Sequence, residues 1–171
     1  MYRIRFHGRG GQGMKTAGRI LGSAFFLEGF EVQDSPRYGA ERRGAPLTSA
    51  VRAARSPIYE RGIILKPDLV VVADDTLVPV PAAGVLQGVE DRTAILIDSD
   101  VSEPKWHQRL QINSVIHTLP APKDLDRAET PYVGSLCAGA AARLTGMISR
   151  RSLEHAVRDE LPDFKENVIE E

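Results

Sequence analysis

The chain has little that would tie it to a metal, a disulfide framework or a membrane. A single cysteine, Cys137, occurs among 171 residues, which excludes an internal disulfide and a cysteine-ligated zinc or iron–sulfur site built by this chain alone. The histidines His7, His107, His117 and His155 show no metal-ligand spacing. No apolar run approaches the length of a membrane span, and no secretory signal opens the sequence. We therefore expect a cytoplasmic protein with no metal site and no membrane contact.

Aromatic residues are also scarce, at 6%. This scarcity and a pI of about 6.4 disfavour a nucleic-acid partner. Charge is unevenly distributed, because residues 1–61 hold eleven Lys/Arg against five Asp/Glu, and the rest holds eleven against eighteen. This predicts an anion-facing first third, with a solvated acidic second part as the alternative. The length suits one domain, which we place at residues 1–162, followed by an acidic tail at 163–171.

The most informative segment is Gly-Arg-Gly-Gly-Gln-Gly at residues 8–13. Residues 2–7 before it alternate polar and apolar side chains, which predicts a half-buried strand. Residues 12–28 after it place Met14, Ala17, Leu21 and Ala24 on one face, which predicts a helix. Strand, glycine turn and helix are the typical opening of an α/β nucleotide-type fold, with bare backbone N–H groups at the positive end of a helix.

Strands and helices alternate along the rest of the chain. We expect strands at 30–34, 47–54, 69–73, 94–97 and 114–118, with an antiparallel orientation open for 47–54. Helical segments are expected at 76–85, 106–111, 122–129 and 132–147, and a last helix capped by Ser149 or Ser152 ends near Leu161. The pattern predicts a three-layer α/β/α fold around a mostly parallel sheet.

Three interpretations of the glycine turn compete. It satisfies the G-x-G-x-x-G spacing of a dinucleotide site, in which Asp34, about twenty residues on, would hold a ribose. It also comes close to a P-loop, but Met14 displaces Lys15 by one residue, which rotates the ammonium about 100° around the helix. The third interpretation is that the glycines serve a tight turn and close helix packing without a ligand.

A second motif argues against the dinucleotide interpretation of the glycine turn. Residues 38–46 read Tyr-Gly-Ala-Glu-Arg-Arg-Gly-Ala-Pro, which has no place in a nicotinamide-binding unit. Five arginines occur between positions 37 and 55, namely Arg37, Arg42, Arg43, Arg52 and Arg55. Guanidinium groups favour two-pronged contact with carboxylates or phosphates. Gly39, Gly44 and Pro46 would fix the shape of this loop, whereas a merely solvated basic loop, the alternative, needs no fixed shape.

Together the two motifs resemble the gamma subunit or gamma domain of the 2-oxoacid:acceptor oxidoreductases, the pyruvate, 2-oxoglutarate, indolepyruvate and phenylglyoxylate types among them. The matching stretches are residues 8–13 with the following helix, 34–44, the Val-Val-Val-Ala-Asp run at 70–74, and 134–149. The resemblance spans about residues 2–160, and the pairing of G-R-G-G-Q-G with Y-G-x-E-R-R-G is far more specific than either half.

The resemblance implies a multi-subunit enzyme that oxidatively decarboxylates a 2-oxoacid to an acyl-CoA. Thiamine diphosphate with Mg²⁺ would sit between alpha and beta subunits. Iron–sulfur clusters in beta and in a ferredoxin-like delta subunit would pass electrons to ferredoxin, or through a flavin (FAD) subunit to NAD. This chain would carry neither thiamine nor cluster and no catalytic residue. It would complete the assembly and help to bind CoA.

The residues implicated in contact with CoA or a partner subunit belong to the two motifs. They are Gly8, Arg9, Gly10, Gly11, Gln12 and Gly13 in the first, and Arg37, Tyr38, Glu41, Arg42 and Arg43 in the second. A stand-alone dinucleotide-binding module and a purely structural assembly subunit remain the alternatives.

Overall fold

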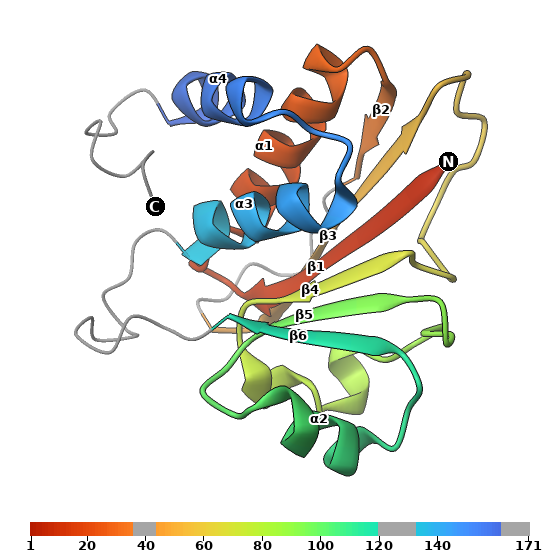
Figure 1. Ribbon diagram of the computed structural model, residues 1–171, viewed down its shortest axis with the longest axis vertical. Helices are drawn as coiled ribbons and strands as arrows, with labels where there is room; N and C mark the ends of the chain where they lie inside the picture. The colour runs from red at the N-terminus through yellow and green to blue at the C-terminus, as the bar shows by residue number, and fades with distance from the viewer. Residues whose placement is uncertain (36–43, 120–132, 162–171) are drawn as a thin grey trace.

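A six-stranded sheet forms the centre of the protein (Figure 1). The computed structural model describes residues 1–35, 44–119 and 133–161. The strands are β1 (Tyr2–Arg9), β2 (Glu31–Asp34), β3 (Pro46–Ala54), β4 (Leu69–Val72), β5 (Ala94–Asp98) and β6 (Val115–Leu119). The helices are α1 (Met14–Leu27), α2 (Glu103–Leu110), α3 (Val133–Thr145) and α4 (Arg150–Glu160), with 3-10 turns η1 (Asp75–Leu77) and η2 (Pro81–Ala83).

The sheet is mixed, with the strand order β2-β3-β1-β4-β5-β6. Strands β1, β4, β5 and β6 run parallel to one another. Strand β3 is antiparallel to both of its neighbours, β1 and β2, and pairs Tyr2 with Ala53 and Arg9 with Pro46. The predicted α/β fold with a mostly parallel sheet is confirmed, and the orientation left open for residues 47–54 is antiparallel.

Helices cover the sheet on both faces, which gives three layers. Helices α1, α3 and α4 pack on one face, where Ile4, Phe6 and Leu69 belong to the larger apolar core (Figure 1). Helix α2 and the two 3-10 turns cover β4, β5 and β6 on the other face, around a second core that contains Trp106. Strand β4 is buried on both faces, because its side chains alternate between the two cores.

The alternating pattern of β1 predicted a half-buried strand, but the structure buries both of its faces. Arg5 is 5% exposed and His7 is 2% exposed, although both lie on the polar side of the strand. The Arg5 guanidinium donates to the carbonyl oxygens of Ile64 (3.2 Å), Val85 (3.0 Å) and Gln87 (2.7 Å). The chain between β3 and β5 therefore covers this face, and its backbone carbonyls replace water as acceptors for Nη1 and Nη2 of the buried guanidinium, while Nε has no hydrogen-bond partner.

Two helical predictions were wrong in extent. The single helix expected at 76–85 is replaced by η1 and η2, because Pro79 and Pro81 cannot donate the backbone hydrogen bonds of a continuous helix. The turn expected at 106–111 is the eight-residue helix α2, which accepts a proline in its first turn. Ser149, and not Ser152, caps α4 and accepts from the Ser152 N–H at 3.2 Å. The helix expected at 122–129 and the tail at 163–171 lie outside the described residues.

Candidate functional site

The glycine turn lies where the connections of the sheet change sides. The chain leaves β1 through α1 on one face and leaves β4 through η1 and η2 on the other, so the switch falls between β1 and β4. Open α/β sheets bind ligands outside the carboxyl ends of the strands at such a point. Three further positions lie at this edge: Gly44, just before the pairing of Pro46 with Arg9, Leu119, which pairs with Asp98, and Gly134, which contacts Gly13.

The turn is held closed by its own residues. Gly11 has φ of 100° and Gly13 has φ of 73°, a left-handed region that glycine enters without steric cost. The Gln12 side chain accepts from the Arg9 N–H at 2.7 Å, and the Gln12 N–H donates to the Arg9 carbonyl at 3.0 Å. Gln12 is therefore a brace for the turn, and its side-chain amide oxygen is already occupied.

Arg9 ties the turn to two other segments. Its Nε lies 2.6 Å from Asp74 Oδ2, its Nη2 donates to Thr76 Oγ1 at 2.8 Å, and its Nη1 donates to the Gly44 carbonyl at 3.0 Å. Asp74 also accepts from the Thr76 hydroxyl. Burial alone would raise the pKa of Asp74, but the hydrogen bonds from Thr76 and Arg9 lower it overall. Arg9 thus meets a fixed carboxylate, and it positions the loop after β4 against the turn.

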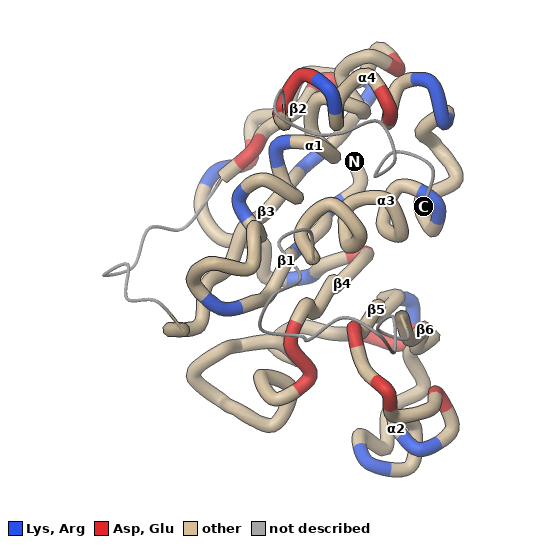
Figure 2. The backbone as a smooth tube through the Cα atoms, turned by 90° about the vertical axis from the view of Figure 1, so that its left-hand side faces the viewer, with Lys and Arg blue, Asp and Glu red and all other residues tan. Residues whose placement is uncertain are grey.

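Asp74 and Thr76 are site residues that no sequence motif predicted. The signal that would have found them is their place directly after the buried strand β4, at the carboxyl edge of a parallel sheet. Figure 2 shows that acidic residues gather at this edge near the ends of β4 and β5. The β1–α1 half of the edge is therefore the more favourable half for an anion.

The glycine turn contacts the end of the arginine segment. The Gly10 N–H donates to the Ala45 carbonyl at 2.9 Å, and the Gly44 N–H donates to the Gly10 carbonyl at 3.2 Å. Gly44 has φ of 86°. The two sequence motifs therefore meet in space at Gly10 and Gly44. The other predicted members of the second motif, Arg37, Tyr38, Glu41, Arg42 and Arg43, lie outside the described residues.

Helix α1 begins at this junction without a side-chain cap and with no acidic residue in its first turn. Its first backbone N–H groups lack intrahelical partners, as at every helix start, and they point toward the junction. Helix α3 approaches the same point, because a Cβ built on Gly134 would lie 2.5 Å from the Gly13 carbonyl oxygen. We call the meeting of residues 8–13, Gly44, Asp74 and Gly134 the glycine junction.

The dinucleotide interpretation does not fit the strand order. In a mononucleotide-binding unit the first two strands are neighbours, whereas here β3 lies between β1 and β2. Asp34 is the last residue of β2, and its Oδ1 lies beside Gly18 of α1. A Cβ added at Gly18 would lie 3.3 Å from this oxygen. Burial raises the pKa of Asp34. Its carboxylate is therefore packed against the middle of the helix and does not face the glycine turn from a neighbouring strand.

Two arginines of the predicted cluster, Arg52 and Arg55, fall within the described residues and lie at the end of β3. Arg52 is 2% exposed and donates to Gln33 Oε1 and the Gly62 carbonyl. Arg55 lies 3.7 Å over the Phe30 ring and donates to the Glu28 carbonyl at 2.7 Å. Both therefore belong to the edge opposite the glycine junction.

The described residues contain no group of three or more His, Cys, Asp or Glu side chains that could hold a metal ion. Cys137 is fully buried, and burial raises the pKa of its thiol far above the ordinary value. Among the described helices, none is long and apolar enough to cross a bilayer. The chemistry that the junction offers is therefore recognition by backbone groups and fixed side chains.

The fold and the junction define an α/β protein that offers backbone donors at a strand switch point. The family model of the pyruvate ferredoxin/flavodoxin oxidoreductases matches residues 3–171, and the chain belongs to this family. A pyruvate/ketoisovalerate oxidoreductase common subunit gamma from Pyrococcus furiosus is 37% identical over 164 residues, covering 93% of this chain and 86% of that protein. A pyruvate synthase subunit PorC from Methanosarcina barkeri is 37% identical over 159 residues, covering 92% and 85%.

Solved structures share the fold. The crystal structure of the pyruvate oxidoreductase subunit PORC from Thermotoga maritima has a TM-score of 0.79 at 29% identity and covers 99% of this chain and 89% of that chain. A 2-oxoglutarate:ferredoxin oxidoreductase from Magnetococcus marinus has a TM-score of 0.67 at 21% identity, and this chain matches 28% of its length. The resemblance to the gamma subunits of 2-oxoacid oxidoreductases is thus confirmed.

Proposed function

We propose that this chain acts as the gamma subunit of a cytoplasmic 2-oxoacid:acceptor oxidoreductase that forms an acyl-CoA. Its relatives are named as gamma or PorC subunits and match it over nearly their full length. The proposal assigns thiamine diphosphate with Mg²⁺ and the iron–sulfur clusters to alpha, beta and ferredoxin-like delta subunits, and FAD to a flavin subunit where NAD is the acceptor. The buried and inert Cys137 is consistent with clusters held elsewhere.

Within this assembly, the glycine junction receives CoA or the face of a partner subunit. The single observation that carries this step is the contact of Gly10 with Gly44 and Ala45, because it joins the uncapped start of α1 to the end of the arginine segment. An anion at this place would meet backbone N–H groups at the positive end of a helix dipole. The arginines of the second motif would supply the positive charge.

Arg9 has a different role from the one that the sequence indicates. Three of its N–H groups are already engaged with Asp74, Thr76 and Gly44, so the guanidinium charge is largely compensated. We therefore treat Arg9 as a positioning residue that fixes the loop after β4. The Gly10 and Gln12 N–H groups already donate within the junction, so the anion contacts fall to the backbone at Gly11, Gly13 and the first turn of α1, and to Arg37, Arg42 and Arg43.

The test uses the assembled enzyme with Arg42→Ala/Arg43→Ala in this chain. Each lost charge-assisted hydrogen bond corresponds to about 1.5–3 kcal/mol, so we expect the KM for CoA to rise by at least about tenfold, or the complex to dissociate. A raised KM in an intact complex identifies a CoA contact, and dissociation identifies a partner contact. The matched control, Arg92→Ala/Arg109→Ala, removes two exposed charges elsewhere. Unchanged assembly and an unchanged KM would show that the second motif serves neither purpose.

A further inference from the structure

Residues 55–68 connect β3 to β4 at the edge opposite the glycine junction, and they form neither helix nor strand. In Figure 1 this connection runs past the N-terminus along one side of the sheet. Connections of this kind are ordinarily mobile, because their backbone is solvated and lacks a hydrogen-bond ladder. This one is instead attached to the sheet by side chains.

Every second backbone carbonyl oxygen from residue 58 to residue 64 accepts a hydrogen bond from a side chain. These carbonyls belong to Ile58, Glu60, Gly62 and Ile64. Two of the donors are buried in the sheet. Arg52 Nη2 lies 3.0 Å from the Gly62 carbonyl oxygen, and Arg5 Nη1 lies 3.2 Å from that of Ile64. Burying a guanidinium is costly unless its N–H groups find acceptors, and the connection supplies acceptors for one Nη group of each arginine.

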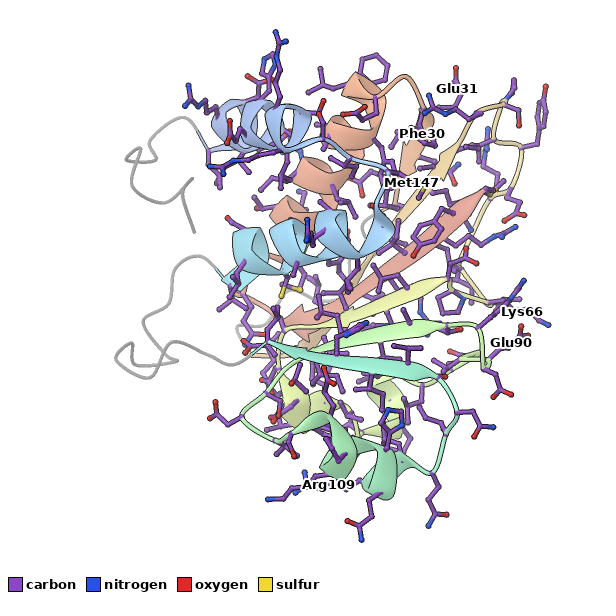
Figure 3. The ribbon with its side chains drawn as sticks, in the orientation of Figure 1. Phe30, Glu31, Lys66, Glu90, Arg109 and Met147 are labelled. Atoms are coloured by element: carbon purple, nitrogen blue, oxygen red, sulfur yellow. The ribbon has the colours of Figure 1, made fainter. Side chains whose placement is uncertain are left out.

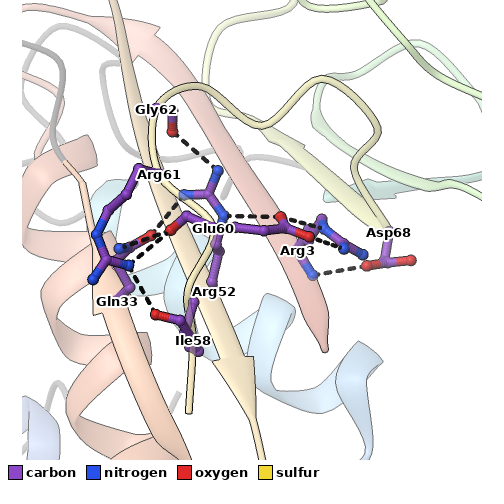
Figure 4. A network of polar contacts seen from close by, with 8 residues as sticks. All are labelled: Arg3, Gln33, Arg52, Ile58, Glu60, Arg61, Gly62 and Asp68. Carbon is purple, nitrogen blue, oxygen red and sulfur yellow. Dashed lines mark hydrogen bonds and ion pairs between the residues drawn. The ribbon is translucent and has the colours of Figure 1, made fainter. Parts of the chain in front are cut away.

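Glu60 completes the attachment (Figure 4). Its carboxylate faces Arg3, with Nη2 at 2.6 Å from Oε1 and Nε at 3.2 Å from Oε2. Arg52 Nε lies 3.6 Å from the same carboxylate. Asp68 accepts from the Arg3 backbone N–H at 2.8 Å and so fixes the end of the connection. The backbone of residues 58–64 is therefore held in one shape from inside the sheet.

The outward side of this rigid connection is apolar. Tyr59 is 83% exposed, Leu65 is 59% exposed and Ile63 is 44% exposed. Three large apolar side chains within seven residues are unfavourable on a permanently solvated surface, and such groupings mark interaction sites. The exposed charges of the connection are mainly basic, because Arg55, Arg61 and Lys66 are exposed, whereas its one acid, Glu60, is paired with Arg3 and Arg52. Lys66 pairs with Glu90 of the next connection, which leaves Arg55 and Arg61 as the basic groups beside the apolar side chains.

We infer that Tyr59, Ile63 and Leu65 form a docking surface for another subunit of the oxidoreductase, one with an apolar patch and an acidic rim. This inference rests on the proposed gamma-subunit function. A second copy of this chain would bring two basic rims together, which opposes self-association. In addition, the same fold occupies 28% of a longer chain in the Magnetococcus marinus protein, where other units of that chain accompany it.

The test combines Tyr59→Ser with Leu65→Ser, changes that leave the attachment through Arg3, Arg5 and Arg52 intact. The chain is co-produced with its alpha, beta and delta subunits, purified through a tag on alpha, and its dissociation constant from the complex is measured. We expect an increase of at least about tenfold, because exposed apolar anchors dominate such interfaces. The control Phe26→Ser/Val115→Ser removes two exposed apolar side chains elsewhere and should assemble normally. Circular dichroism and thermal unfolding establish that both variants fold.

The outcomes separate this inference from the proposed function. If the wild-type chain does not co-purify with any of these subunits, the proposed function is wrong. If the wild-type chain assembles and the Tyr59→Ser/Leu65→Ser variant assembles equally well, only the docking surface is wrong. Sedimentation of the isolated chain gives a further check, since a dimer that this variant abolishes would assign the surface to a second copy and overturn the inference.

Discussion

His7 is an ionisable side chain inside the sheet, one residue before the glycine junction. It lies 2% exposed on β1, and its Nδ1 lies 3.1 Å from the Ala83 carbonyl oxygen, so that nitrogen carries the proton of the neutral ring. Burial lowers the pKa of His7 from 6.5 to about 4, the Arg5 charge lowers it further in the same direction, and the Ala83 bond opposes the shift. His7 is therefore neutral in the folded protein at physiological pH.

This shift predicts a loss of stability in mild acid. Between pH 6.5 and 4 the unfolded chain binds a proton at His7 that the folded chain does not, so stability falls as the pH falls through this window. The full effect is about 3 kcal/mol in the free energy of unfolding. Urea unfolding of the wild type and of His7→Asn, from pH 7 to pH 4, measures it. Parallel pH profiles for the two proteins would show that His7 does not titrate in this way.

Arg9 shows what a sequence can and cannot reveal about a site residue. Its position inside the glycine motif indicated a functional residue, and the structure places it at the junction. Its partners Asp74 and Thr76, however, are more than sixty residues away in the chain, and no local spacing connects them with Arg9. A guanidinium has the same signature in the sequence whether it binds a ligand or another segment, because only the tertiary structure brings a carboxylate to it.

At the scale of elements, the junction depends on a close approach between α3 and the glycine turn. Gly134, near the start of α3, leaves no room for a side chain, since an added Cβ would lie 2.5 Å from the oxygen and 2.9 Å from the carbon of the Gly13 carbonyl. Both obstacles are backbone atoms, so neither can rotate away. The small-residue composition of α3 thus sets the position of the helix relative to the turn.

Gly134→Ala is therefore expected to lower the free energy of unfolding by about 1–3 kcal/mol, because α3 must shift. Gly139→Ala is the matched control in the same helix, since no described atom lies within 4 Å of its added Cβ. That substitution should stabilise the protein by about 0.5–1 kcal/mol through helix propensity alone. Urea titrations measure both differences. A Gly134→Ala protein as stable as the control would mean that the helix and the turn have room to separate.

The elements themselves were largely predictable, but their arrangement was not. Patterns of apolar residues located β1, α1, β3, β4, β5, β6, α3 and α4 to within a few residues, and Ser149, one of the two predicted caps, is the residue that caps α4. The insertion of β3 between β1 and β2 left no local signal, because pairing depends on which edges meet and not on the pattern within a strand. The burial of Arg5 and Arg52 was also missed, since their carbonyl partners come from distant connections.

At the scale of the whole molecule, the protein presents two functional edges. The glycine junction lies at the carboxyl ends of β1 and β4, and the docking surface of Tyr59, Ile63 and Leu65 lies beyond their amino ends. The eight residues of β1 separate them by about 25 Å, at roughly 3.3 Å per residue. Figure 3 shows Lys66 and Glu90 near the second edge, where their side chains pair at 2.5 Å. A subunit built in this way can contact two different neighbours at once.

This separation predicts that defects at the two edges are independent. The Arg42→Ala/Arg43→Ala change should weaken CoA binding or the subunit contact at the glycine junction. The Tyr59→Ser/Leu65→Ser change should weaken the subunit contact at the docking surface. Substitutions more than about 10 Å apart that share no partners have effects that add to within about 0.5 kcal/mol. The combined variant should therefore show fold-changes in complex dissociation and in the KM for CoA that equal the products of the separate values, within about a factor of two. The fold-changes of the combined variant could instead be no larger than those of the more strongly affected of the two separate variants. In that case both edges meet one continuous surface of a single partner, and the two-edge arrangement is wrong.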